Sequence, residues 1–193
     1  MSNIYFISGP CGVGKSTLAD AYAKYLTNTG IRKQVYVIHG DDFHQGFVLR
    51  AYEEDTYWEN GQAANQIEWT EILKFNWECI LDVAAKALKR GMDVLIDYIV
   101  EDELPLLKDL AKEYNAGLYY LVLTASADEI RKRIEKRGDT EMVERALFLK
   151  EKLENAAENN GHIYDNTGKS MEQETEEIAA LIKNGSLICE KES

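Results

Sequence analysis

The chain has 193 residues, close to the length of one average domain, and its 45% hydrophobic content is sufficient for a buried core. Its formal net charge is −12, because 34 acidic residues oppose 22 basic ones. A strongly acidic surface repels the phosphates of nucleic acids and anionic membrane surfaces, so we expect neither as a partner.

The remaining composition favours a soluble protein of one domain. The apolar stretches have the length of strands and fall far short of a membrane span, and no signal peptide precedes the first of them. Three widely spaced cysteines suit neither a disulfide framework nor a zinc site. We therefore expect a cytoplasmic protein with a single domain over residues 1–183 and a loose tail over residues 184–193.

Short β-rich runs alternate with longer amphipathic segments along the whole chain. This alternation is typical of βαβ units and predicts an α/β fold with a parallel sheet. The expected strands are 3–8, 34–39, 92–97, 117–124 and a weaker run at 162–165. Helices are expected from about Leu18 to near Gly30, over about 72–88, 104–114 and 143–153, and from the caps Ser126 and Ser170 onward.

Several of these helices carry recognisable end signals. Gly91 stands where the long second helix should end, as glycine often does at a helix C-terminus. Ser126 with Glu129, and Ser170 with Gln173, each have the spacing of a capping box, in which the two residues satisfy free N–H groups at a helix start.

The most specific pattern is a phosphate-binding loop over residues 9–17, which has the form G-x-x-x-x-G-K-[ST] between an apolar strand and an amphipathic helix. Glycines let successive N–H groups turn onto phosphate oxygens, Lys15 adds a positive charge, and the Ser16 hydroxyl suits Mg²⁺. The sequence therefore predicts nucleotide phosphate binding. The expected nucleotide contacts are Gly9, Cys11, Gly12, Val13, Gly14, Lys15, Ser16 and Thr17.

Carboxylates follow two of the expected strands. Ligands of a parallel sheet gather beyond the carboxyl ends of its strands, where Asp41, Asp42 and Asp97 should lie. Phosphoryl transfer to a hydroxyl needs a carboxylate that orients or deprotonates the acceptor. We expect Asp41 to do this, with Asp42 as its competitor, and Asp97 to contact the metal or the acceptor. His44 is a weaker acceptor contact.

Residues 131–137 contain five basic residues and one acidic residue in an otherwise acidic chain. Arg133 and Arg137 are one helical turn apart, and their guanidinium groups suit γ-phosphate oxygens. We expect residues 131–145 to form a lid and both arginines to be catalytic. A solvated helix face is the alternative interpretation.

Over residues 3 to about 183 the chain resembles the small P-loop kinases of the shikimate kinase, gluconate kinase and chloramphenicol phosphotransferase type. The phosphate loop carries this resemblance, and Gly40-Asp41 with His44 resembles the G-D-x-x-H of gluconate kinases. The resemblance implies a P-loop fold of three layers, with a five-stranded parallel sheet of order 2-3-1-4-5, a helical lid, and ATP with Mg²⁺. It also implies that Asn166 and Thr167 flank the adenine.

The acceptor side is expected over residues 41–80, where two basic residues oppose nine acidic ones. This charge disfavours a dianionic acceptor, so the expected activity is transfer of the ATP γ-phosphate to a hydroxyl of a neutral or cationic small molecule. Arg50 is the expected contact for a single carboxylate on the acceptor. A nucleoside or nucleoside monophosphate kinase, or an ATPase switch without transfer, remains as an alternative, and either a monomer or a dimer is compatible with the sequence.

Overall fold

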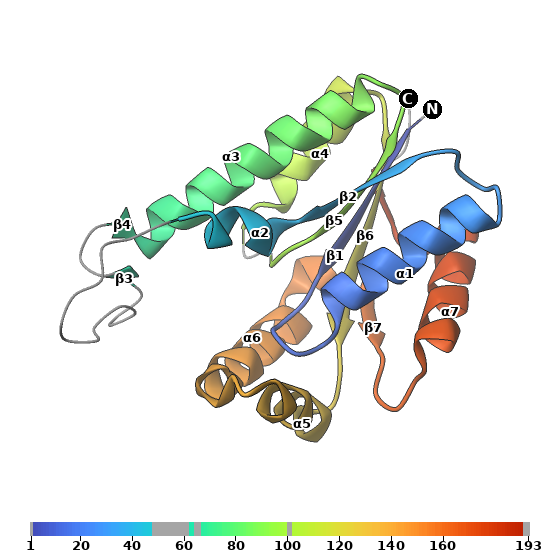
Figure 1. Cartoon of the computed structure of the whole chain (residues 1–193). Coiled ribbons are helices and arrows are strands. Elements are labelled where there is room, and N and C mark those ends of the chain that lie inside the picture. The colour runs from blue at the N-terminus through green and yellow to red at the C-terminus, as the bar shows by residue number, and fades with distance from the viewer. Residues whose placement is uncertain (1, 48–61, 64–66, 100–101, 191–193) are drawn as a thin grey trace.

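The computed structural model of the chain describes residues 2–47, 62–63, 67–99 and 102–190. A central sheet runs through it, with helices on both sides (Figure 1). The strands of this sheet are β1 (Asn3–Ser8), β2 (Val35–His39), β5 (Asp93–Asp97), β6 (Gly117–Thr124), β7 (Ile163–Asp165) and β8 (Ile188–Glu190). A separate pair consists of β3 (Gln62–Ala63) and β4 (Ile67–Glu68).

The first five strands of the main sheet are parallel and follow the order β2-β5-β1-β6-β7. This is the predicted order 2-3-1-4-5, so the expected α/β P-loop fold is confirmed. Each of these strands begins and ends within one residue of its expected range. The register pairs His39 with Asp97 and Ile7 with Asp97, which brings the carboxyl ends of β2, β5 and β1 to one edge.

The expected loose tail is wrong for residues 188–190, because β8 pairs with β6 in an antiparallel direction. Leu187 is buried in the core, and its carbonyl accepts a hydrogen bond of 2.9 Å from the backbone N–H of Tyr120. This apolar side chain therefore fixes the end of the chain along the first half of β6.

Helices cover both faces of the sheet (Figure 1). Side chains of α3 and α4 form one core with the strands, and side chains of α1, α5 and α7 form the other. The helices are α1 (Lys15–Asn28), α2 (Gly40–Gln45), α3 (Trp69–Leu88), α4 (Leu104–Glu113), α5 (Ala127–Arg137), α6 (Val143–Asn155) and α7 (Met171–Lys183). Short 3₁₀ turns are η2 (Thr140–Met142) and η3 (Ala157–Asn159).

The two expected capping boxes differ in outcome. At α7 both bonds form, since Ser170 accepts from the Gln173 N–H and the Gln173 side chain accepts from the Ser170 N–H. At α5 Ser126 accepts from the Glu129 N–H, but the Glu129 carboxylate accepts from Arg133 instead.

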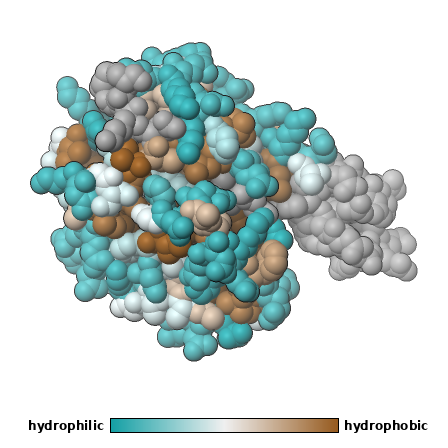
Figure 2. Space-filling model, turned by 180° about the vertical axis from the view of Figure 1, so that it is seen from behind, coloured by the Kyte–Doolittle hydropathy of each residue, from teal (hydrophilic) through white to brown (hydrophobic). Residues whose placement is uncertain are grey.

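On the face of the molecule shown in Figure 2, hydrophilic side chains separate scattered hydrophobic ones. Within the described ranges, none of the helices has the length and apolar composition needed to span a membrane.

The start of α2 depends on a close approach between Gly40 and the ring of Tyr98. A Cβ atom added at Gly40 would lie 2.3 Å from Cδ2 of Tyr98, well inside van der Waals contact. Tyr98 is buried and has little room to move, because its hydroxyl accepts a 2.8 Å bond from Asn76 and its ring packs edge-on against Trp77. Glycine at position 40 thus lets α2 begin directly after β2.

We expect Gly40→Ala to reduce the free energy of unfolding by about 1–3 kcal/mol, the usual cost of overpacking a core. Urea denaturation measures this cost. Gly46→Ala at the other end of α2 is the matched control, because the nearest atom to its added Cβ would be 3.3 Å away. Equal stability of the two variants would show that the Tyr98 ring imposes no constraint on α2.

Candidate active site

The phosphate loop leaves β1 at Gly9 and enters α1 at Lys15, as predicted. Gly12 and Gly14 have φ values of 80° and 96°, in the left-handed region that favours glycine. Gly14 is the N-cap of α1. The loop therefore ends at a helix N-terminus, where free N–H groups and the helix dipole favour anions.

The Lys15 amine folds back over the loop and donates a 3.1 Å bond to the Pro10 carbonyl. Burial lowers the pKa of Lys15, and the nearby charges of Asp41 and Asp97 oppose this shift. Lys15 thus lies within electrostatic reach of two of the three carboxylates expected at the site, Asp41 and Asp97.

Asp97 lies beneath the loop at the end of β5 and is buried. One of its carboxylate oxygens accepts a 2.5 Å bond from the Ser16 hydroxyl, and the other forms a short hydrogen bond with Nδ1 of His39. Nε2 of His39 lies 3.5 Å from Asp20. Burial opposes the charged form of His39, but the bond and charge of Asp97 outweigh it and raise the pKa of His39.

A cleft of about 530 Å³ opens beside the phosphate loop. Its walls come from the phosphate loop, from α2, from Ile99 after β5, and from the end of α5, the turn that follows it and the first half of α6. It is lined by Gly9, Cys11, Gly12, Gly14, Lys15, Ser16, Asp41, His44, Gln45, Ile99, Arg137, Asp139, Met142, Arg145 and Leu149.

Of the two neighbouring carboxylates that the structure describes on α2, Asp41 lines this cleft and Asp42 does not. His44, one turn after Asp41, also lines it. Burial lowers the pKa of His44, and the charge of Asp41 opposes the shift. The α2 helix therefore presents one carboxylate and one imidazole to the same space as Lys15.

The two arginines expected in the lid occupy different places. Arg137 lines the cleft, where its guanidinium donates to Sγ of Cys11 at 3.1 Å and to the carboxylate of Asp139 at 2.8 Å. Arg133 is instead held behind the loop by the carboxylate of Glu129 at 3.0 Å and the carbonyl of Val13 at 3.1 Å. The structure thus places one of the two arginines near the expected phosphates and the other against the loop backbone.

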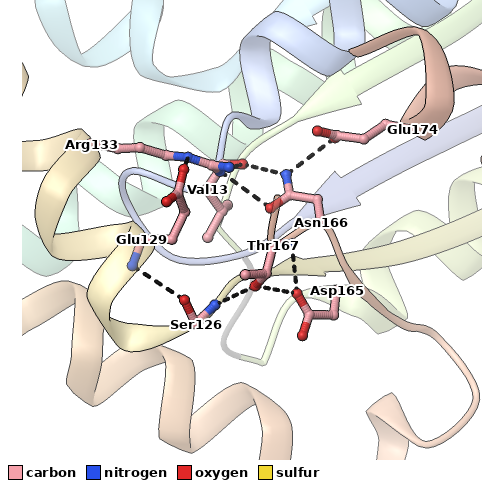
Figure 3. Close-up of polar contacts among 8 residues, drawn as sticks. All are labelled: Val13, Ser126, Glu129, Arg133, Asp165, Asn166, Thr167 and Glu174. Carbon is pink, nitrogen blue, oxygen red and sulfur yellow. Dashed lines mark hydrogen bonds and ion pairs between the residues drawn. The ribbon is translucent and has the colours of Figure 1, made fainter. Parts of the chain in front are cut away.

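Figure 3 shows the polar network that surrounds Arg133. Asn166, from the loop after β7, accepts from Arg133 at 3.2 Å and donates to the Val13 carbonyl at 2.9 Å. The Thr167 hydroxyl donates to Asp165 at 2.6 Å and accepts from the Ser126 N–H at 2.7 Å. The loop after β7 is thereby tied to both the phosphate loop and the start of α5.

The structure brings most of the expected site residues together at one edge of the sheet. Val13 is buried under the loop, Thr17 is exposed on the first turn of α1, and Arg50 lies outside the described residues. Asn166 contacts Arg133 and the Val13 carbonyl, and neither Asn166 nor Thr167 lines the cleft. Sequence reasoning did not single out the cleft residues Gln45, Ile99, Asp139, Met142 and Leu149, or the buried Glu174 that contacts Asn166.

The chain matches the AAA domain family AAA_18 over residues 6–158. It is 23% identical to a guanylate kinase of Caldanaerobacter subterraneus subsp. tengcongensis, in an alignment that covers 91% of this chain and 84% of that protein. It is 30% identical to a guanylate kinase of Syntrophus aciditrophicus over 59% of this chain and 53% of that protein.

Two solved structures have a similar fold. The APS kinase of Mycobacterium tuberculosis, in complex with AMPPNP and APS, aligns over 94% of this chain and 98% of its own, with a TM-score of 0.62 and 16% identity. A gluconokinase of Sinorhizobium meliloti aligns over 95% of this chain and 94% of its own, with a TM-score of 0.56 and 17% identity. The chain therefore belongs to the AAA domain family AAA_18 and has the P-loop kinase fold.

Proposed function

We propose that the protein is an ATP-dependent phosphotransferase that moves the γ-phosphate of ATP to a hydroxyl group of a small molecule. The observation that carries this proposal is the shared cleft, in which Lys15 of the phosphate loop and Asp41 of α2 line the same space. A cation for the phosphates and a carboxylate for the acceptor are the two groups that this reaction requires in one place.

In the proposed reaction the acceptor oxygen forms a bond to the γ-phosphorus, and the bond between this phosphorus and the oxygen that bridges to the β-phosphate breaks, so that ADP leaves. Asp41 orients the acceptor hydroxyl and takes its proton, which then passes to solvent. Lys15 and Arg137 stabilise the negative charge that shifts onto the phosphate oxygens during the transfer.

The residues beneath the loop fit a magnesium ion. The Ser16 hydroxyl and the Asp97 carboxylate lie 2.5 Å apart, and both are oxygen donors of the kind that Mg²⁺ prefers. We propose that Ser16 would hold the ion and that Asp97 would orient the Ser16 hydroxyl toward it. When bound, Mg²⁺ would neutralise charge on the β- and γ-phosphates.

The acceptor wall favours a neutral or cationic molecule. On this side of the cleft α2 contributes a carboxylate, an imidazole and an amide, and Ile99 adds an apolar surface. An anionic acceptor would be repelled by Asp41, whereas a cationic group would be attracted. The apolar side chains of Met142 and Leu149 on the lid side suit an acceptor with an apolar face.

Transfer to a nucleoside monophosphate is the second candidate, because two of the similar proteins are named guanylate kinases. Arg145 would favour this acceptor, since it lines the cleft and carries a positive charge that suits a phosphate.

A panel of acceptors tests the proposed function. ADP release from MgATP is measured with hydroxyl metabolites, nucleosides, aminoglycosides and nucleoside monophosphates, each added separately. Stimulation by a neutral or cationic hydroxyl compound supports the proposal, and stimulation by GMP or another monophosphate alone supports the second candidate. Slow ADP release that no acceptor changes would identify an ATPase switch instead.

Replacement of Lys15 by alanine should lower the rate of phosphoryl transfer by about 10²-fold or more, because it removes a charge that stabilises the transition state. The rate is measured with saturating MgATP and the acceptor that the panel identifies. Lys24→Ala is the matched control, since Lys24 is an exposed lysine of the same helix. A Lys15→Ala variant with the activity of this control would contradict the phosphate-loop assignment.

Asp41→Asn should lower phosphoryl transfer by ~10²-fold or more while MgATP affinity and melting temperature stay near those of the wild type. The substitution preserves the shape of the side chain but removes its charge and basicity. Asp42→Asn, the adjacent control, should lower the rate of phosphoryl transfer much less, because Asp42 does not line the cleft.

Both variants are compared at a saturating concentration of one acceptor, so that weaker binding is not mistaken for slower chemistry. Loss of activity in Asp42→Asn alone would show that Asp42, and not Asp41, is the acceptor carboxylate. Full activity in both variants would exclude both carboxylates and make Asp97 the leading candidate.

A further inference from the structure

The Val13 carbonyl accepts two side-chain hydrogen bonds, one from Arg133 at 3.1 Å and one from Asn166 at 2.9 Å. In a trans peptide the carbonyl and the following N–H point in opposite directions, and the described chain contains no cis peptide. Fixing the Val13 carbonyl therefore directs the Gly14 N–H away from Arg133 and Asn166. Gly14 is a cleft-lining residue at the N-terminus of α1, where an inward N–H meets a phosphate.

The Asn166 amide fits this position in only one orientation. Its Nδ2 donates to the Val13 carbonyl and, at 3.1 Å, to Oε2 of Glu174, while its Oδ1 accepts from Arg133 (Figure 3). The reversed amide would place Oδ1 against two acceptors and Nδ2 against a guanidinium donor. Glu174 thus helps to determine which atom of Asn166 faces the phosphate loop.

Glu174 is only 3% exposed, which is unusual for a glutamate in the first turn of a helix. Burial raises the pKa of Glu174, whereas the Asn166 bond and the charge of Arg133 lower it in part. A buried carboxyl group is costly unless it is hydrogen-bonded. Oε2 of Glu174 accepts its bond from Asn166 in either protonation state, provided that any proton is on the other oxygen.

We propose that Glu174 is a positioning residue for the phosphates of the nucleotide, and that it acts through the Asn166 amide on the Val13 carbonyl. This inference rests on the proposed function for nucleotide binding, but it gives Asn166 a role at the phosphate loop rather than at the base. Loss of the hydrogen-bond acceptor at Glu174 should therefore weaken the binding of every ligand that uses the N–H groups of the phosphate loop, whether or not the ligand carries a base.

The test uses calorimetric titration of the full chain with AMPPNP and with tripolyphosphate, each in the presence of Mg²⁺. Glu174→Met retains most of the side-chain volume but removes the hydrogen-bond acceptor. It should lower the affinity for both ligands by about tenfold. Glu174→Gln retains an acceptor oxygen and should bind both within about threefold of the wild type. Glu177→Met is the matched control, because Glu177 lies on the same helix and accepts from Tyr164 and Lys169 instead.

If Glu174→Met does not fold, Asn166→Ala tests the same contact. It should lower the affinity for both ligands by more than tenfold. Weaker binding of AMPPNP with unchanged tripolyphosphate binding would overturn the inference, because the pair would then act on the base. Wild-type affinity in both Glu174→Met and Asn166→Ala would also overturn it. A wild-type protein that binds neither ligand would instead refute the proposed function itself.

Discussion

The phosphate loop is fixed between the end of β5 and one face of α5. On the β5 side Ser16 donates to the buried Asp97, and on the α5 side three consecutive loop residues meet the helix. The contacts on this side join Cys11 to Arg137, Gly12 to Ile134 and Val13 to Arg133. A Cβ atom at Gly12 would lie 2.7 Å from Cγ1 of Ile134, so the backbone of the loop rests directly on the helix.

This arrangement divides the predicted lid into two parts. The helix α5 forms a wall of the phosphate loop, since its residues 133, 134 and 137 all contact it. After α5 the chain turns at Gly138, which has a φ of 88°, and Asp139, Met142 and Arg145 follow along the cleft. The residues after Gly138 therefore continue the cleft wall that begins at Arg137, whereas Arg133 contacts the backbone of the phosphate loop.

Much of the fold follows from local sequence patterns. The strands were predictable because each is a short β-rich run, and β1 and β5 are buried along their whole length. The phosphate loop was predictable because its chemistry depends on residues that are adjacent in the sequence. The strand β8 was missed because its apolar run, Leu187 to Cys189, is short and follows polar residues, and because its partner β6 lies some 70 positions away in the sequence.

The candidate site was less predictable where distant elements decide which way a side chain points. Arg133 and Arg137 have the same spacing and chemistry as a pair of lid arginines, yet the Val13 carbonyl and Asn166 hold the first one behind the loop. Glu174 has the sequence signature of an ordinary acidic residue near a helix N-terminus. Glu174 is buried where α7 packs against α1 and where Asn166 of the loop after β7 contacts it, and no local pattern reveals these contacts between distant elements.

A crystal structure with AMPPNP and Mg²⁺ would show directly where the phosphates bind relative to the phosphate loop and α2. The expected result is that the triphosphate lies on the N–H groups of the phosphate loop, with Ser16 in contact with the metal and with the γ-phosphate facing Asp41 across the cleft. A triphosphate bound elsewhere, or a γ-phosphate that faces away from α2, would contradict it.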